Sequence, residues 1–283
     1  MPLLLKNSIL GYNRPMTLHI DTPEMRFAAT FAKEAGNLIR QKFESPAPHS
    51  WKPDNTTITE VDTELNRRFI TEAAQQFPAY SILGEEESQV ITGAEWAWVI
   101  DPLDGTNSFI SGLPLSTCCI ALLHDGTPEL GVIYDPFMDR LFYAQKGKGA
   151  FLNDQKITVS DATSWERQFI HMDMLKTGNP SLVALREKLF KDGAKAISMD
   201  SIQHRLALTC AGRAAGAFFF LPSFWDVAAS YIIGTEAGAV ATDIAGKQQR
   251  YDQPTNGFIL ANPTLHPKLV ALVQEFLGPN PTI

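Results

Sequence analysis

Apolar residues recur at helical spacing in two stretches near the start of the chain. Residues 25–43 place apolar side chains on one helical face, and residues 59–77 repeat the pattern. An apolar stripe of this period predicts two amphipathic helices. The Pro-, Ser- and Asn-rich stretch between them, residues 45–57, predicts an exposed loop that could serve as a flap. The apolar positions of the two faces are Phe27, Phe31, Ala35, Leu38 and Ile39, then Val61, Leu65, Phe69, Ile70 and Ala73.

From about residue 96 the pattern changes to short β-type runs. The runs WAWVIDPL, TCCIALL, ELGVIY and RLFYAQ are separated by turn signals such as His124-Asp125-Gly126, and this succession predicts an antiparallel meander. After about residue 161 the strand-like runs FIHM, AISM and AFFFL alternate with helical segments near 181–191, from about 201 to 212, and from Trp225 onward. Such alternation predicts layered helices and sheets.

The change of pattern suggests three parts. We expect an N-terminal extension over residues 1–24, an N-terminal α+β half over residues 25–160, and a C-terminal α/β half over residues 161–283. The boundary near 160 is compositional, and the alternative to separable halves is two halves that share one interface.

Composition and charge limit the partners that we expect. The chain has 283 residues, 45% of them hydrophobic and 19% charged, which is typical of a globular protein. Its formal net charge is −7, and it has no block of Lys or Arg. Because nucleic-acid binding depends on neutralising phosphates, we expect no nucleic-acid polymer as a partner. An acidic protein that handles a phosphate must neutralise it locally, and a bound divalent cation does this with fewer basic residues.

The sequence also predicts a cytoplasmic protein without a membrane partner. No apolar stretch approaches the roughly 20 residues that a membrane-spanning helix needs. The run Leu3 to Leu5 lacks the flanks of a secretion signal. Cys118, Cys119 and Cys210 have neither zinc-site nor disulfide spacing, so we expect buried free thiols in a reducing compartment.

Two carboxylates follow a predicted buried strand in the segment WVIDPLDGTNSF. Asp101 and Asp104 stand where Pro102 and Gly105 shape a turn, so their side chains can converge on one point. Hard divalent cations prefer such oxygen ligands. If the chain turns into a helix there, the amides of Gly105 and Thr106 would face an anion at its N-terminus. The alternative is a turn in which the Asp side chains cap backbone amides.

Two further acidic elements indicate a metal site only when other carboxylates lie close to them. The run Gly84-Glu85-Glu86-Glu87 would by itself indicate a solvated loop. Asp226 follows Trp225 at the start of a predicted helix, where an Asp ordinarily caps the helix or complements its dipole. These alternatives hold unless other carboxylates lie opposite.

Together, and in this order, the elements resemble the inositol monophosphatase superfamily of lithium-sensitive, Mg²⁺-dependent phosphatases. That family shows a Gly-Glu-Glu loop, an Asp-Pro-hydrophobic-Asp-Gly-Thr signature, and Trp-Asp followed by small residues and a Glu-Ala-Gly stretch, here Glu236-Ala237-Gly238. The resemblance extends from the helix at 25 to the region of Asn262. It implies an α/β fold, an alternating α-β-α-β-α sandwich of the inositol monophosphatase / fructose-1,6-bisphosphatase type, and commonly a homodimer.

The resemblance also implies which residues hold two or three Mg²⁺ ions. Glu85, Asp101 and the Leu103 carbonyl would hold one ion, and Asp101, Asp104 and Asp226 a second. Asp62 would act with Thr106 to orient and deprotonate the attacking water. Glu86 would assist through a water on a third, weaker ion. By residue chemistry alone, Asp62 would be read as an ordinary helix-face or N-terminal Asp.

The expected reaction is hydrolysis of a phosphate monoester by metal-activated water. A competing phosphatase class uses a nucleophilic Asp in the sequence Asp-x-Asp-Gly-Thr. Here Asp101 lies three residues before Asp104 and Pro occupies position 102, so the spacing argues against an aspartyl-phosphate intermediate.

The motifs leave the substrate open, because they handle the phosphate rather than the alcohol. Inositol-specific relatives carry a Glu where this chain has Phe218 to Pro222, which argues against inositol itself. Histidinol phosphate, fructose 1,6-bisphosphate, a nucleotide bisphosphate or another sugar phosphate stay open. His204 and Arg205 are candidate substrate contacts, and a surface or core role is the alternative. A non-catalytic relative that binds a phosphorylated metabolite or a metal is the alternative function.

Overall fold

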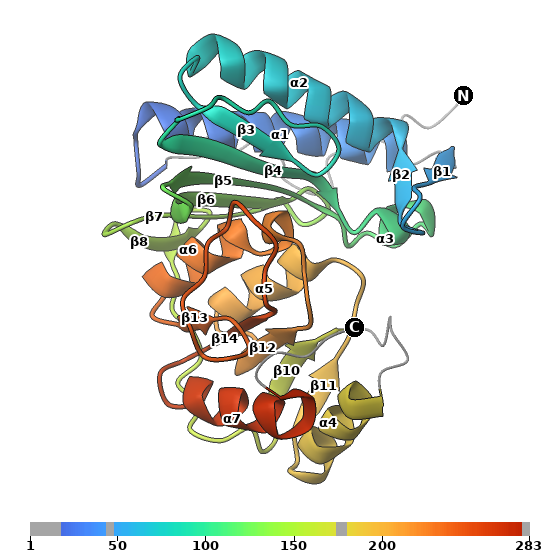
Figure 1. The fold of residues 1–283 in the computed structure, drawn as a ribbon, viewed down its shortest axis with the longest axis vertical. Helices are drawn as coiled ribbons and strands as arrows, with labels where there is room; N and C mark the ends of the chain where they lie inside the picture. The colour runs from blue at the N-terminus through green and yellow to red at the C-terminus, as the bar shows by residue number, and fades with distance from the viewer. Residues whose placement is uncertain (1–17, 44–47, 174–179, 279–283) are drawn as a thin grey trace, which may run out of the picture.

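Five layers of helices and sheets build the protein (Figure 1). The computed structural model describes residues 18–43, 48–173 and 180–278. Helices α1 (Pro23–Phe43) and α2 (Glu60–Gln76) form the first layer, and a seven-stranded sheet forms the second. Helices α5 (Ile202–Cys210) and α6 (Ala228–Glu236) form the middle layer. A five-stranded sheet follows, and α4 (Pro180–Lys191) and α7 (His266–Leu277) cover its far face.

The seven-stranded sheet contains the predicted meander. Its strand order is sequential, and every neighbouring pair is antiparallel except the first, which is parallel. One face packs on α1 and α2 around the buried ring of Trp98. The strands are β3 (Ser81–Gly84), β4 (Trp96–Asp104), β5 (Thr117–His124), β6 (Thr127–Asp135), β7 (Arg140–Gln145), β8 (Gly149–Leu152) and β9 (Gln155–Lys156).

The five-stranded sheet is mixed, with the order β11-β10-β12-β14-β13. β10 is parallel to both of its neighbours, and β14 is antiparallel to both of its own. Parallel neighbours need a crossover, which α4 and α5 supply between β10, β11 and β12. The strands are β10 (Phe169–Met172), β11 (Lys195–Ile197), β12 (Gly216–Phe219), β13 (Val240–Thr242) and β14 (Phe258–Ala261).

The middle helices join the two sheets through one apolar core. Val99 and Cys119 of the first sheet share this core with Phe219 and Leu260 of the second, and with residues of α5 and α6. The change from one sheet to the other falls between β9 and β10, close to residue 160. Division of the chain into two separate halves stays a prediction, because the core is shared.

Local structure departs from the sequence-based expectation in two places. Part of the predicted flap forms a hairpin, in which β1 (His49–Trp51) pairs with β2 (Thr57–Thr59). The helix predicted from Trp225 begins as a 3₁₀ turn, η1 (Phe224–Asp226), and continues as α6. Residues 45–47 of the predicted flap and the first 17 residues of the predicted extension lie outside the described residues.

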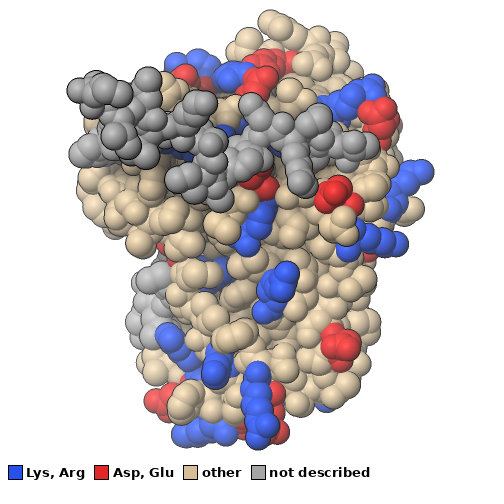
Figure 2. Space-filling model, turned by 180° about the vertical axis from the view of Figure 1, so that it is seen from behind, with Lys and Arg blue, Asp and Glu red and all other residues tan. Residues whose placement is uncertain are grey.

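Other expectations agree with the described structure. Cys118, Cys119 and Cys210 are buried and free, as predicted. No helix among the described residues is long and apolar enough to cross a membrane. On the face shown in Figure 2, basic and acidic side chains are interspersed among uncharged ones.

Candidate metal centre and active site

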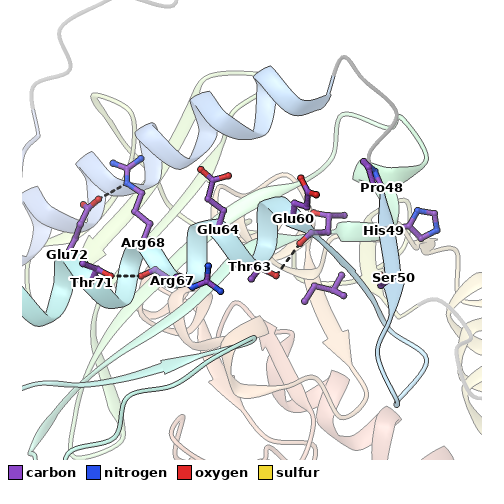
Figure 3. A pocket seen from close by; sticks show the side chains of 12 residues that line it. Pro48, His49, Ser50, Glu60, Thr63, Glu64, Arg67, Arg68, Thr71 and Glu72 are labelled. Atoms are coloured by element: carbon purple, nitrogen blue, oxygen red, sulfur yellow. Dashed lines mark hydrogen bonds and ion pairs between the residues drawn. The ribbon is translucent and has the colours of Figure 1, made fainter.

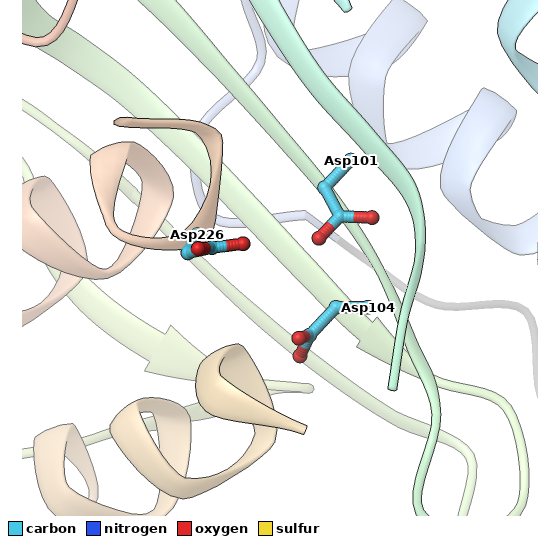
Figure 4. A group of neighbouring side chains, drawn as sticks. All are labelled: Asp101, Asp104 and Asp226. Carbon is cyan, nitrogen blue, oxygen red and sulfur yellow. The ribbon is translucent and has the colours of Figure 1, made fainter. Parts of the chain in front are cut away.

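Three carboxylates from two distant segments converge at the C-terminal end of β4 in the first sheet. Asp101 and Asp104 end β4, and Asp226 ends η1. One oxygen of each lies within 4.8 Å of the others, and Figure 4 shows the three side chains turned toward one another. Residues three apart in a regular strand point to opposite faces. The register with β5 shifts between Asp101 and Asp104, and this irregularity accompanies the convergence of the two carboxylates.

Asp226 combines a local structural role with its place in this group. The backbone N–H of Ser223 donates to Asp226 Oδ2 at 2.8 Å, which closes the turn of η1. The expected capping function is therefore present. The turn also brings the carboxylate opposite β4, so capping and convergence are compatible at one residue.

Asp104 is anchored at the N-terminus of α5. Its Oδ2 accepts hydrogen bonds from Ser201 Oγ, from Gln203 N at 2.8 Å and from Thr117 Oγ1 at 3.1 Å. Its Oδ1 accepts one from Ile202 N at 3.0 Å. An ionised carboxylate offers about four lone-pair sites, so Oδ1 retains capacity for a further ligand. Burial raises the pKa of Asp104, and the bonds from Ser201 and Thr117 oppose that rise.

Asp101 lies in an unfavourable electrostatic setting. It is buried, and Leu103 N donates to its Oδ1 at 3.1 Å. Burial and the neighbouring charges of Glu85, Asp104 and Asp226 raise its pKa well above the ordinary value. A divalent cation among these oxygens would remove the like-charge penalty, and an all-carboxylate donor set suits Mg²⁺. The residues present therefore fit the implied metal.

Glu85 and Glu86 both form ion pairs with one lysine. Lys52, from the turn of the β1–β2 hairpin, lies 2.9 Å from Glu85 Oε1 and 2.6 Å from Glu86 Oε1. Glu85 shares a cavity with Asp101, Asp104 and Asp226 but stands outside the close group of three. Burial raises the pKa of Glu86 to about 7, and the bond from Lys52 opposes the rise.

Asp62 and Thr106, which were predicted to act as a pair, are hydrogen-bonded. Thr106 Oγ1 lies 3.1 Å from Asp62 Oδ1 and 3.1 Å from the Leu103 carbonyl oxygen. Asp62 is also the N3 residue of α2, where its Oδ2 accepts from Thr59 N at 2.8 Å. Burial raises the pKa of Asp62 to about 6, although these bonds oppose the rise. A buried carboxylate of this kind can accept a proton near neutral pH.

A cavity of about 440 Å³ connects most of these groups. Gly105 lines it at φ 90°, a left-handed conformation that suits glycine, and begins α3 (Thr106–Ile110). Asp200 holds this short helix, because its carboxylate accepts from Ser108 N at 2.7 Å and from Asn107 Nδ2 at 3.2 Å. Leu221, Pro222 and Trp225 form an apolar part of the lining.

A larger cavity lies elsewhere and does not contain the converging carboxylates. It has a volume of about 850 Å³ and runs along the outer face of α2 beside the hairpin (Figure 3). Its charged lining includes Glu64, Arg67 and Arg68. We place the candidate active site in the smaller cavity, because chemistry depends on convergent groups rather than on volume.

His204 and Arg205, the candidate substrate contacts, do not line the candidate cavity. His204 is buried, and its ring nitrogens lie 3.1 Å from the Leu115 carbonyl oxygen and 3.0 Å from an Arg140 nitrogen. Arg205 donates to the carbonyl oxygens of Ser201, Met172 and Asp200. Both side chains support the backbone around α5, because the helix directs them into the core.

Sequence reasoning missed several residues that shape the site. Lys52 and Asp200 line the cavity, and Ser201 holds Asp104. Lys52 stands in a Pro- and Asn-rich stretch, and Asp200 precedes a predicted helix. Neither position carries a local pattern that predicts a functional contact, because each contact depends on a distant segment.

Comparison with known proteins decides the family. A model of the inositol monophosphatase family matches residues 21–277. The chain belongs to the inositol monophosphatase family. This confirms the resemblance inferred from the motifs, and the layered fold agrees with the α/β sandwich that the resemblance implied.

Two relatives match most of this chain. "Nus factor SuhB" of Escherichia coli (strain K12) is 31% identical over 267 residues, covering 90% of this chain and 97% of the relative. A "Fructose-1,6-bisphosphatase/inositol-1-monophosphatase" of Thermotoga maritima is 33% identical over 222 residues, covering 77% of this chain and 82% of the relative. These names describe the relatives.

Solved structures of family members have the same fold. The extragenic suppressor protein suhB from Bartonella henselae superposes with a TM-score of 0.84 at 26% identity, covering 90% of this chain and 99% of that chain. The Thermotoga maritima IMPase superposes with a TM-score of 0.83 at 28% identity, covering 90% and 98%. The fold of this chain is therefore that of its family.

Proposed function

We propose that the protein is a Mg²⁺-dependent hydrolase of small phosphate monoesters. The observation that carries this proposal is the convergence of Asp101, Asp104 and Asp226 within 4.8 Å in a cavity of an inositol monophosphatase family member. Carboxylates from distant segments rarely cluster without a compensating charge, because mutual repulsion raises their pKa values.

Five residues would hold two metal ions in this proposal. Glu85, Asp101 and the Leu103 carbonyl would hold one, and Asp101, Asp104 and Asp226 the other. When bound, such ions supply positive charge to phosphoryl oxygens and lower the pKa of water. Glu86 would assist at a third, weaker ion. The shared cavity and the buried carboxylates support this set.

Asp62 and Thr106 would orient the attacking water and accept its proton. A hydroxyl has one proton, so Thr106 Oγ1 can donate to Asp62 and still accept a hydrogen bond from water. The raised pKa of Asp62, about 6, suits a base that works near neutral pH. Hydrolysis then needs no covalent intermediate: the water oxygen bonds to phosphorus, and its proton passes to Thr106 as Thr106 gives its own to Asp62. The bond to the alcohol oxygen breaks, and the leaving alkoxide takes a proton from solvent water.

The amides of Gly105 and Thr106 would steady the phosphate beside the metals. Gly105 lines the cavity and its left-handed conformation brings the backbone close. The hydrogen bonds from Asp200 keep α3 in place. Because α3 has five residues, its dipole is short, and the two amides rather than the dipole would carry this contact.

The choice of alcohol stays open within small phosphorylated metabolites. Histidinol phosphate, sugar phosphates including fructose 1,6-bisphosphate, and nucleotide bisphosphates remain predictions, as do lithium sensitivity, a homodimer and a cytoplasmic location. The alternative is a relative that binds a phosphometabolite or metal without turnover.

Release of inorganic phosphate from a panel of these esters, with Mg²⁺ and with EDTA, tests the proposal. We expect Mg²⁺-dependent release that falls by 10–100-fold or more in Asp226→Asn. Asp243→Asn is the matched control, because Asp243 is buried and hydrogen-bonded but lies outside the cavity lining. Absence of release with every ester would favour the non-catalytic alternative. Equal release with EDTA would contradict the proposal.

A further inference from the structure

Asn66 lies between α2 and the loop that carries Glu85 and Glu86. Its side chain is buried, and its Nδ2 donates to the Glu87 carbonyl oxygen at 3.0 Å. It follows Asp62 by one helical turn, and residues four apart lie on the same helical face. We propose that Asn66 is a positioning residue, which fixes the loop so that the Glu85 carboxylate is placed for cation binding. This inference rests on the proposed function, in which Glu85 is a metal ligand.

The contact with Asn66 gives a physical reason for the glycine of the Gly-Glu-Glu motif. A Cβ atom added at Gly84 would lie 2.3 Å from Asn66 Oδ1 and 2.4 Å from the Glu87 carbonyl oxygen. Both distances are well below van der Waals contact. Gly84 is also not among the glycines with positive φ. The glycine is therefore needed for close approach of Asn66 rather than for a left-handed turn.

Two other contacts hold the same loop. Glu85 N donates to the Ile100 carbonyl oxygen at 3.1 Å, which ties the loop to β4 one residue before Asp101. Ser88 Oγ accepts from Gly84 N at 3.1 Å and closes the turn. Asn66 adds the link to α2. The loop that carries Glu85 is thus held between the strand that bears Asp101 and the helix that bears Asp62.

The electrostatics show that these elements interact across a short distance. The charge of Glu85 raises the pKa of Asp62, after the larger effect of burial. A small movement of the loop relative to α2 would therefore change the distance between the water-orienting carboxylate of Asp62 and the metal-binding carboxylate of Glu85. Catalytic groups tolerate displacements of only about 0.5 Å.

The chemistry of Asn66 is costly for a residue with only a packing role. Its Oδ1 is buried and accepts no hydrogen bond from the described residues. An unpaired buried acceptor destabilises the folded protein unless water satisfies it, and a leucine of similar size would avoid that cost. A leucine would, however, lack the amide donor that binds the Glu87 carbonyl oxygen. Keeping this hydrogen bond despite the unpaired Oδ1 is expected where the position of the loop matters more than the stability of the protein.

Titration calorimetry with Mn²⁺ alone tests the inference without relying on turnover. We expect Asn66→Leu to raise the Mn²⁺ dissociation constant by about 10–100-fold, as loss of groups that support metal ligands commonly does. Its melting temperature in EDTA should stay close to that of the wild type, because loss of the hydrogen bond to the Glu87 carbonyl is offset by removal of the unpaired Oδ1. Gly84→Ala should weaken Mn²⁺ binding in the same direction, and it carries the test if Asn66→Leu does not fold.

Asn262→Leu is the matched control. Asn262 is also buried, and its Nδ2 donates to the carbonyl oxygens of Ser160 and Ala162 at 2.7 and 2.8 Å. It lies outside the candidate cavity, so its replacement should lower the melting temperature and leave Mn²⁺ affinity within twofold. If Asn66→Leu or Gly84→Ala behaves in this way, the inference is wrong. If the wild type binds no Mn²⁺, the proposed function itself fails.

A double variant tests whether Asn66 acts through Glu85. Contacts that act through one shared group are non-additive. We expect Asn66→Leu to weaken Mn²⁺ binding in the wild type and to add less than twofold in a Glu85→Gln background. Full additivity of the two losses would contradict a positioning role exerted through Glu85.

Discussion

Lys52 Nζ lies 2.9 Å from Glu85 Oε1, so a lysine from the hairpin neutralises a predicted metal ligand. Burial lowers the pKa of Lys52, but Glu85 and Glu86 outweigh this and hold it above the ordinary value. A charged ammonium beside a carboxylate competes with a metal ion for the same oxygens. The hairpin and the metal should therefore influence each other.

Replacing this lysine should strengthen metal binding. We expect Lys52→Gln to lower the Mg²⁺ concentration for half-maximal phosphate release by about tenfold, equivalent to the 1.4 kcal/mol that one such competing contact can contribute. Lys146→Gln is the control, because Lys146 forms an exposed pair with Glu129 at 2.5 Å. An unchanged or higher Mg²⁺ requirement in Lys52→Gln would show that the ion pair does not compete with the metal.

Asp101 and Asp104 should differ in their effects on stability. Asp101→Asn removes a buried charge from a repulsive group, so in EDTA at pH 8 it should raise the melting temperature. The Asp104 carboxylate accepts four hydrogen bonds, and in Asp104→Asn the amide NH₂ group would face some of these donors. This should lower the free energy of unfolding by about 1–3 kcal/mol and lower the melting temperature. Both variants should lose Mg²⁺-dependent phosphate release. Calorimetric scans in EDTA measure the difference, and shifts of equal sign would argue against it.

The raised pKa of Asp62 predicts a definite pH dependence of stability. The pKa is 3.8 for the ordinary carboxyl and about 6 in the folded protein, so the unfolded chain ionises first as pH rises. The stabilising contribution is complete below the ordinary value and is lost as pH rises toward 6. The loss amounts to about 3 kcal/mol, since one pKa unit corresponds to about 1.4 kcal/mol.

Urea unfolding in EDTA between pH 4 and pH 8 measures this slope. Asp62→Asn should flatten the fall in unfolding free energy between about pH 4 and 6. Glu86, whose pKa is raised to about 7 chiefly by burial, adds a slope of the same sign in both proteins. A wild-type profile that rises with pH over this window would contradict the assignment for Asp62.

The sequence was most informative where a motif and a local pattern coincide. Trp98 to Asp104 could be predicted as a buried strand that ends in carboxylates, because a run of apolar residues is followed directly by turn residues. Pairing of Asp62 with Thr106 depended on the family resemblance, since helix capping alone explains an Asp at that position. The structure shows both the cap and the bond to Thr106.

Contacts between distant segments could not be predicted. Lys52 and Ser201 touch site residues 33 and 97 positions away, and Asn66 touches Glu87, a residue of the Glu85 loop 21 positions away. No local period encodes such separations. The buried position of Arg205 was equally hard to predict, because a charged residue on a helix can face the core when backbone carbonyls accept hydrogen bonds from it.

The central claim is that Asp101, Asp104 and Asp226 hold a divalent cation, and anomalous diffraction from a Mn²⁺-soaked crystal tests it most directly. We predict a strong anomalous peak within about 2.5 Å of an oxygen from each of the three carboxylates. A well-ordered map without a peak among them, or with Mn²⁺ bound only elsewhere, would contradict the account.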